Sequence, residues 1–489
     1  MPDSIKGGGM NFDLRFKSRS DEQRSEEPPA IAILGDFGSQ TSVAESKSSD
    51  PLRVDCDNFD EVFAKIGVGL DLPSCAERAA EIKLRFRTLD DFHPEQLLHQ
   101  LKTLANLAEL RSKLFHPESM DAAAKELQEV LKIGALPPDT PPASDESTEE
   151  MLGRLLGKPA SEPSRAATAG LANRLIQQIV GANVPSVHRQ QSQLVALADA
   201  ELSVRLRAIL HHTAFQAIEA AWRGLDFLVR NTAGEVKLYV INLCQSDLAK
   251  MLSGEDVAKS VIYKQLEKIR PAVVLGVYTL GPQDHTLLAG IARLANACHT
   301  AFVAGASPHL VGCGSFGAQP DPDDWTTRSS DALEGFRALR RMPEAVHLGL
   351  SMPRFLLRQP YGKGSDTIDA FPFEEMPAKP EHESYLWGNP AFLCGHLLAD
   401  QFESSDSDQD VHGGGEVSGL PIHKFTSDGE TQVKPCAEAW LSERAAEAIL
   451  SHGIMPVLSV HGRDAVQLLT LRALSDPPRP LAVGLEFQG

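Results

Sequence analysis

Hydrophobic positions in the first 132 residues follow two different spacings. The run AIAILG, which starts at Ala30, is apolar throughout and ends at a glycine, as is typical of a buried strand. LRVDCDNFDEVFAKIG at 52–67 predicts a strand and then a helix, and strand-like alternation follows at 82–86. After DDFHP a long helix is predicted, because one side of it carries Leu97, Leu101, Leu104, Leu107 and Leu114. We therefore expect a small α/β unit over residues 28–132, preceded by a polar leader over residues 1–27.

Residues 133–169 change in composition to Pro, Ser, Ala and acidic residues, which predicts a flexible, solvated linker. One short helix is predicted inside it, at residues 147–158, with an apolar stripe. The stripe consists of Met151, Leu152, Leu155 and Leu156. Such a helix is too short to be stable alone. It either docks on its own protein or serves as a ligand for a partner, and the pattern leaves both open.

The stretch from His211 to Asn231 predicts a regular helix. Its apolar residues recur every three or four positions, which places them on one face. Glu219 and Arg223 are four residues apart, so we expect them to pair on the surface. The adjacent side chains of His211 and His212 point in different directions on a helix and do not converge on one ion. We therefore expect a packed core helix with a solvated N-terminal end.

From residue 170 onward the chain alternates strand and helix patterns, which indicates an α/β fold. The strand candidates are EVKLYVINL, PAVVLGVYTL, HTAFVAGAS and AVHLGLSM. The final third, from about residue 358, is rich in loops, and the acidic stretch 403–410 is expected to be a disordered surface loop. The fold class predicted for the whole chain is therefore α/β, with a small N-terminal unit, a Pro-rich linker and a larger α/β domain over residues 170–489.

Charge and composition exclude several functional classes. The 489-residue chain has 66 acidic and 47 basic residues, a net charge of −19, which argues against binding to nucleic acid or to an anionic membrane. Seven scattered cysteines without a CxxC motif are typical of reduced thiols in a cytoplasm. The first 23 residues contain no apolar run typical of a signal peptide, and the longest apolar run in the sequence is too short to span a bilayer. We expect a cytoplasmic protein without membrane insertion.

Motifs for catalysis or cofactor binding are weak. The glycines of GCGSFG at 312–317 are not followed by a helix pattern, so a loop is predicted there, and GRLLGKP at 153–159 lacks the spacing of a phosphate loop. Neither HExxH nor GxSxG occurs. His412 and His423 lie near glycines but have no third ligand in range. We therefore predict no enzyme, and no catalytic, cofactor-binding or metal-binding residues.

Several ordered motifs resemble one known family. ILHHTAFQAIEAAWRGLDFLV at 209–229 closely resembles the signature helix of the large sheath subunit of type VI secretion systems, the TssC or VipB family. LGLSMPRFLLRQPYG, FPFEE, YLWGNPAF and GGGEVSGLPIHKF follow in the family's order. The first unit resembles the small sheath subunit, the TssB or VipA family, through AIAILGDFG, VDCDNFDEVFAKI and the leucine-rich stretch 84–114. The chain thus resembles a fusion of the two subunits.

This resemblance implies a structural protomer of a contractile sheath, which associates with other sheath subunits around an inner tube and on a baseplate, and contracts to propel the tube. It implies no cofactor, and it assigns Phe215 and Trp222 to maintaining the shape of a rigid body. An ATPase of the unfoldase type recycles the sheath, and the stripe 151–156 occupies the place of its handle. Strand exchange between protomers is assigned to a leader segment with alternating Phe12, Leu14 and Phe16.

Three departures from the family are visible. The two subunits are joined by a linker, the acidic stretch 403–410 replaces a tryptophan-containing segment, and the chain stops at Gly489, where the large subunit continues. With one good donor strand, the protein alone is expected to form small oligomers. An alternative is therefore a sheath-like accessory protein that caps, terminates or anchors a sheath of ordinary subunits. A third hypothesis is a nucleotide-dependent enzyme. It is disfavoured because neither glycine-containing motif has the sequence context of a nucleotide-binding loop.

Overall fold

The computed structural model describes residues 28–38, 50–72, 82–131, 186–232, 234–254, 256–326, 331–377, 379–403, 413–427 and 429–484. We call residues 28–131 the N-terminal part and residues 186–484 the C-terminal part. The expected leader 1–27, linker 133–169 and short helix 147–158 lie outside the described residues, as do residues 404–410 of the acidic stretch. None of the described helices combines the length and apolar character that crossing a membrane requires.

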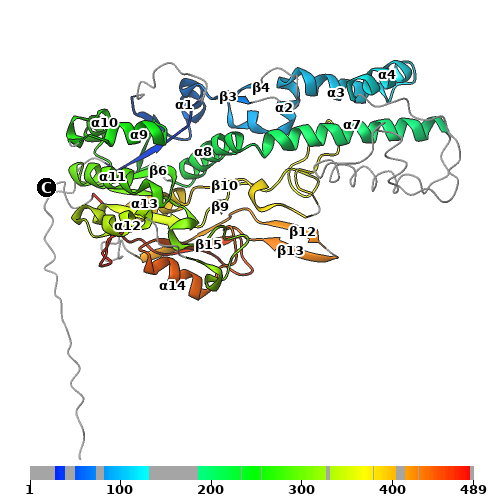
Figure 1. Ribbon diagram of the computed structural model, residues 1–489. Coiled ribbons are helices and arrows are strands. Elements are labelled where there is room, and N and C mark those ends of the chain that lie inside the picture. The colour runs from blue at the N-terminus through cyan, green and yellow to red at the C-terminus, as the bar shows by residue number, and fades with distance from the viewer. Residues whose placement is uncertain are drawn as a thin grey trace, which may run out of the picture.

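A nine-stranded sheet forms the centre of the molecule, in the order β11-β15-β14-β8-β7-β6-β1-β5-β2 (Figure 1). In chain order these strands are β1 (Ala30–Gly35), β2 (Leu52–Val54), β5 (Lys237–Asn242), β6 (Val273–Leu280), β7 (Ala301–Ala306), β8 (Leu348–Met352), β11 (Gly413–Ser418), β14 (Met455–Ser459) and β15 (Ala465–Thr470). The six strands from β5 to β14 in the middle of this order run parallel, and β2, β15 and β11 pair antiparallel. The α/β fold class and the four strand candidates of the C-terminal part are confirmed.

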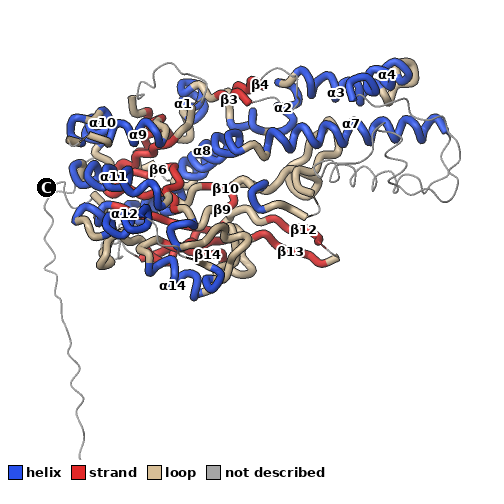
Figure 2. Tube along the Cα trace, viewed as in Figure 1, coloured by secondary structure: helices blue, strands red, loops and turns tan. Residues whose placement is uncertain are grey.

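Helices cover both faces of the sheet, which explains why strands β1, β7 and β8 are buried along their whole length (Figure 2). In β1, Ile31 and Ile33 belong to one hydrophobic core, and Ala32 and Leu34 belong to the other. The first core contains side chains of α1 (Phe59–Ile66), α8 (Thr213–Arg230) and α13 (Ala391–Glu403). The second contains side chains of α9 (Gln245–Leu252), α10 (Val261–Ile269), α11 (His285–Ala297), α12 (Asp331–Arg340) and α14 (Glu443–Ser451).

A helical arm extends from this body (Figure 1). It comprises α2 (Pro94–Gln100), α3 (Lys102–Lys113), α4 (Met120–Leu131) and α7 (Ser186–Leu210). The predicted leucine face is buried, but the single long helix predicted after residue 94 was wrong. Leu101 has an extended backbone (φ −99°, ψ 108°) and separates α2 from α3. Tertiary packing on both sides of Leu101 thus overrides the local preference for one continuous helix.

Three two-stranded sheets and several 3₁₀ turns complete the described structure. The small sheets pair β3 (Gly69–Leu72) with β4 (Ile82–Arg85), β9 (Phe355–Leu356) with β10 (Trp387–Gly388), and β12 (His423–Ser427) with β13 (Glu430–Lys434). The 3₁₀ turns are η1 (Leu89–Phe92), η2 (Val257–Lys259), η3 (Pro282–Asp284), η4 (Pro308–Val311), η5 (Pro322–Asp324), η6 (Pro343–His347) and η7 (His382–Ser384). The glycine-rich stretch at 312–317 follows η4 as a loop, as predicted, with Gly312 at φ 79°.

Candidate functional site

The N-terminal part places one strand in the middle of the sheet of the C-terminal part. All six positions of β1 pair with β5, and Ile31 to Leu34 pair on the other side with β6. The backbone pairing continues beyond the strand ends, since Lys237 N donates to Pro29 O and Leu243 N to Gly35 O, at 2.9 and 2.8 Å. Every residue of β1 is buried. The sheet of the C-terminal part is therefore continuous only with a strand of the N-terminal part in place.

Trp222 on α8 lies at the centre of an aromatic cluster that joins the two parts. Its ring centroid lies 5.4 Å from that of Phe37, 5.7 Å from Phe59 and 4.2 Å from Phe63. Its indole Nε1 donates a 2.9 Å hydrogen bond to Phe37 O, so the polar edge of this fully buried ring is satisfied. These partners all come from the N-terminal part. Trp222 therefore fixes how α8 packs against the N-terminal part.

Phe215, two turns closer to the start of α8, makes a second contact of the same kind. Its ring lies 6.0 Å from Phe86 and 5.6 Å from Phe92 in edge-to-face geometry. Phe86 and Phe92 also stack on each other at 4.2 Å. The apolar face of α8 is thus the surface on which the N-terminal part packs.

The two histidines at the start of α8 have separate structural partners. His212 is the N-cap residue, and its Nδ1 accepts a hydrogen bond of 3.2 Å from Ala214 N. His211 points to Glu375, with its Nε2 at 3.6 Å from Oε1. The expectation that the two rings do not converge on one ion is confirmed by these positions.

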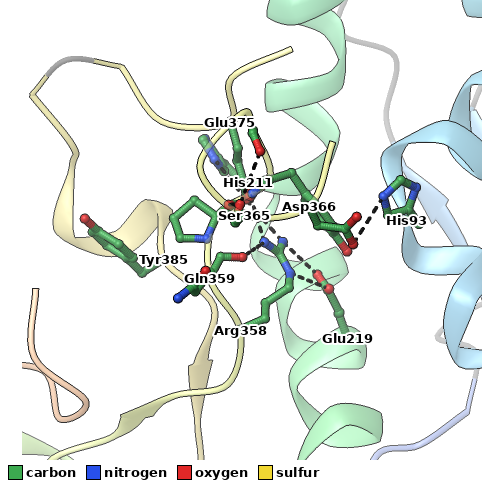
Figure 3. A network of polar contacts seen from close by, with 12 residues as sticks. His93, His211, Glu219, Arg358, Gln359, Ser365, Asp366, Glu375 and Tyr385 are labelled. Atoms are coloured by element: carbon green, nitrogen blue, oxygen red, sulfur yellow. Dashed lines mark hydrogen bonds and ion pairs between the residues drawn. The ribbon is translucent and has the colours of Figure 1, made fainter. Parts of the chain in front are cut away.

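A buried network of ion pairs lies on a second face of α8, distinct from the apolar face that carries Trp222 (Figure 3). Glu219 accepts hydrogen bonds from Arg223 Nε at 2.7 Å and from Arg358 Nε at 2.8 Å. Arg358 also donates to Glu375 at 2.7 and 3.1 Å, and its guanidinium lies 4.1 Å from the ring centre of Tyr361. Two carboxylates and two guanidinium groups balance each other, which offsets the cost of burying charge.

The prediction that Glu219 and Arg223 pair at the surface was wrong about the location. The pair forms, but Glu219 is 0% exposed, and Arg358, from the segment 358–375, contacts it. We call residues 358–375 the clasp. The sequence pattern of α8 alone shows spacing along one helix and cannot show a segment that folds over it.

The charge of Glu375 is strongly stabilised. Burial alone raises the pKa of its carboxyl, but Arg358, the nearby His211 side chain and the Tyr361 main-chain N–H outweigh that effect and lower the pKa to about 2. Burial raises the pKa of Tyr361 to about 12, so its phenol stays protonated. It accepts a 3.0 Å hydrogen bond from Arg223. The network is therefore a fixed set of charges at ordinary pH.

The clasp also contacts the N-terminal part and the arm. Arg111 of α3 donates a 3.0 Å hydrogen bond to Ala370 O and forms an ion pair with Asp199 of α7. His93, at the start of α2, lies 3.5 Å from the carboxylate of Asp366 (Figure 3). Arg207 of α7 donates to the main-chain oxygen at position 374, at 3.0 Å. The clasp thus fastens α8, the arm and the N-terminal part together.

A second polar cluster surrounds Arg354. Its Nε and main-chain N each donate to the Glu438 carboxylate at 2.9 Å, and its guanidinium also reaches Glu383 at 3.1 Å. His382 lies 3.2 Å from Glu438 and accepts a 2.8 Å hydrogen bond from Lys434. Within the described residues, one side-chain ligand atom from each of His382, Glu383 and Glu438 lies within 4.8 Å of the other two, a spacing that fits a metal ion. Arg354 already pairs with both carboxylates, so we interpret the group as an ion-pair cluster.

The remaining residues singled out from the sequence fall in two groups. Outside the described residues lie Met151, Leu152, Leu155, Leu156, Phe12, Leu14, Phe16, His412 and the stretch 153–159. His423 is described, and its Nδ1 lies 2.8 Å from the hydroxyl of Tyr385. The assignments of an ATPase handle and of a strand donor therefore stay predictions.

Sequence reasoning missed the central place of β1 and both polar clusters. A signal for the first existed, because a run as uniformly apolar as AIAILG is typical of a strand covered on both faces. Arg358 and Glu375 lie within the quoted motifs LGLSMPRFLLRQPYG and FPFEE, but nothing in those motifs shows that they meet.

Comparison with known proteins gives a consistent result for both parts. Residues 192–474 match the family described as EvpB/VC_A0108, tail sheath N-terminal domain (VipB). Residues 10–134 match the family described as type VI secretion system, VipA, VC_A0107 or Hcp2. The type VI secretion system sheath protein TssC1 of Pseudomonas aeruginosa is 32% identical over 344 residues, which cover 65% of this chain and 69% of that protein.

Proposed function

Because this chain belongs to the VipB tail sheath family and carries a VipA-type segment ahead of it, we propose that it combines both subunit types of a sheath protomer in a single chain. It is a structural protein of a type VI secretion sheath. The observation that carries the proposal is the position of β1, which comes from the VipA-type segment and pairs on both sides with strands of the VipB-type domain. Residues 28–132 and 170–489 are the proposed counterparts of the two subunits.

The proposed role requires a rigid protomer. A sheath that transmits force needs protomers that move as solid bodies, since packed cores resist deformation. The shared sheet, the Trp222 cluster and the clasp each fasten the VipA-type segment to the VipB-type domain. Sheath proteins are structural, and the proposal assigns the work of contraction to packing between protomers and to no catalytic residue.

Membership of a sheath family implies association with other sheath subunits. We further propose, from the family resemblance, contacts with an inner tube and a baseplate and recycling by an unfoldase-type ATPase. The stripe 151–156 is the proposed ATPase handle, and Phe12, Leu14 and Phe16 are the proposed strand donor. A cytoplasmic location fits the six described cysteines, all of which are free thiols.

The accessory alternative is not favoured, because the matched regions are the sheath-forming domains of both subunit families. Negative-stain electron microscopy separates the two readings. The purified protein is imaged alone and after mixing with a separately produced large sheath subunit, and gold particles mark a tag on this chain.

Cogwheel tubes with gold along their whole length are expected for a protomer. Gold confined to tube ends would support the accessory reading instead, and a chain absent from every tube would contradict both. The matched control is Ile33→Asp, which places a charge on the buried strand β1 and should remove the chain from the tubes.

A further inference from the structure

The amine of Lys434 lies in a chain of three polar side chains outside the interface described above. Lys434 ends β13, and its Nζ donates a 2.8 Å hydrogen bond to His382 Nδ1. His382 Nε2 lies 3.2 Å from Glu438 Oε1. Because Nδ1 accepts from the amine, the proton of the neutral imidazole belongs on Nε2, where it is donated to Glu438. The order is amine, imidazole, carboxylate, which is the arrangement of a nucleophile, its base and an orienting group.

The base in this arrangement is held firmly. Glu438 is 4% exposed, and two hydrogen bonds of 2.9 Å from Arg354 fix its carboxylate. The ring of His382 lies 5.1 Å from that of Trp387, which limits its rotation. The imidazole therefore presents Nδ1 to Lys434 in one orientation.

The surroundings of Lys434 favour the neutral amine. Its Nζ lies 5.5 and 5.4 Å from the ring centres of Tyr385 and Trp387, contacts that favour the ammonium form, but the residue is half-buried, which favours the neutral amine. Burial lowers the pKa of Lys434 and Arg354 lowers it further, while Glu438 and Glu383 oppose both, so that the pKa falls to about 8. A sizeable fraction of this amine is therefore unprotonated near neutral pH, unlike that of an ordinary lysine with a pKa of about 10.4.

We propose that Lys434 is an acylation site of this protein, reactive toward acyl phosphates through the Lys434–His382–Glu438 chain. The ammonium group first transfers one proton to His382 Nδ1, and the resulting imidazolium is stabilised by Glu438. The free amine attacks the acyl carbonyl, a C–N bond forms, and the C–O bond to phosphate breaks. Phosphate leaves with the electron pair and takes the second amine proton, and His382 returns its proton to water.

Acylation has a local structural consequence. Lys434 is the point where hairpin β12–β13, which extends from the body in Figure 1, meets the cluster around Arg354. The product amide is neutral, so the cation between the hairpin and the Glu438 carboxylate is lost. Acylation is thus a change of charge at the base of this hairpin, and it does not depend on the role of the protein in a sheath.

The test uses the full chain and acetyl phosphate as the probe. Acetylation of each lysine is followed over time by peptide mass spectrometry across a range of pH. Lys424 is the matched control, because it is an exposed lysine on the facing strand of the same hairpin, opposite Val433. We expect Lys434 to react about tenfold faster than Lys424 near neutral pH, since its larger free-amine fraction outweighs its lower intrinsic nucleophilicity.

Two further measurements separate this proposal from a purely structural role of Lys434. The rate at Lys434 should level off above about pH 8, whereas an ordinary lysine continues to gain reactivity up to about its pKa of 10.4. His382→Gln should slow Lys434 to the rate of Lys424 and leave Lys424 unchanged. Equal rates at the two lysines in the unmodified protein would overturn the proposal, and so would a rate at Lys434 that rises past pH 8 without levelling. Both results are obtained without any variant.

Discussion

The indole Nε1 of Trp222 donates a 2.9 Å hydrogen bond to the main-chain oxygen of Phe37. Phe37 follows β1 in the N-terminal part, and Trp222 lies on α8 in the C-terminal part. The main-chain N–H of Phe37 is also bound from the C-terminal part, by Asn242 Oδ1 at 2.9 Å. The main-chain N–H and C=O of Phe37 are therefore both hydrogen-bonded to the C-terminal part. These two bonds fix where Phe37 lies, in addition to the burial of its side chain.

The first prediction concerns this hydrogen bond. Trp222→Phe keeps an aromatic ring but leaves the Phe37 carbonyl without its partner and opens space beside Phe63. We expect a loss of about 2–4 kcal/mol in the free energy of unfolding, which combines an unsatisfied buried group with a small cavity. Urea denaturation followed by circular dichroism measures it.

Trp325→Phe is the matched control for that change. Trp325 Nε1 also donates to a carbonyl at 2.9 Å, but its acceptor, Gln319, is six residues away within the same part. An equal loss in both variants would show that the Trp222 bond has no special place in joining the parts.

The second prediction concerns the buried network. Arg358→Leu leaves Glu219 and Glu375 without a shared cation, and an uncompensated buried charge costs about 3–5 kcal/mol. Arg230→Leu is the control: Arg230 lies on α8, as Glu219 does, and its side chain is 71% exposed, so loss of its ion pair with Asp226 should cost less than about 1 kcal/mol. Similar melting temperatures for the two variants would contradict a stabilising role of the clasp.

The third prediction concerns acid. The pKa values of Glu375 and Glu438 are lowered to about 2 in the folded protein, mainly because arginine and histidine partners outweigh burial. The ordinary value is 4.5, so below that pH the unfolded chain binds more protons than the folded one. Stability is therefore complete above about pH 5 and declines as the pH falls toward 2, on the order of 3 kcal/mol for each carboxyl.

Glu375→Gln provides the check on this acid effect. Its free energy of unfolding should be lower at neutral pH and should fall less steeply between pH 5 and 3 than that of the unmodified protein, because one titrating group is gone. Parallel curves over that range would assign the acid sensitivity to other residues.

The fourth prediction concerns the contact between α8 and α13. A Cβ on Gly224 would overlap the ring of Phe392, so in Gly224→Ala the ring or the two helices must shift. The collision should outweigh the usual gain of about 1 kcal/mol for alanine in a helix and destabilise the protein by about 1–3 kcal/mol. Gly364→Ala is the control, since a Cβ there meets nothing within 4 Å. A stabilised Gly224→Ala variant would contradict the close approach.

Much of the fold could be predicted from local patterns. The helix at His211 and the strands β5 to β8 have apolar spacings that identify them without tertiary knowledge, and all lie where they were predicted. The break at Leu101 could not be predicted, because its leucine spacing continues smoothly through the position. What ends the helix there is packing on both sides, which no local pattern encodes.

The candidate site was harder to predict from the sequence, because it too depends on contacts between distant segments. The Pro-rich stretch 133–169 divides the sequence into two units, and local patterns assign each strand to its own unit. In space, β1 crosses that division and pairs with β5 and β6. The partners of Glu219 are likewise a neighbour on its helix and a residue far along the chain, and only the neighbour is visible in the spacing. Family resemblance supplied the functional class, and the geometry supplied the residues that join the parts.

The central claim is that the two parts form one protomer through their shared sheet, independent of the peptide connection. The direct test introduces a protease site near Pro142, cuts the purified chain, and passes it over a sizing column at micromolar concentration. We expect both fragments to elute together at the volume of the uncut protein. With Ile33→Asp, the fragments should separate. Separation of the fragments without that substitution would contradict the claim.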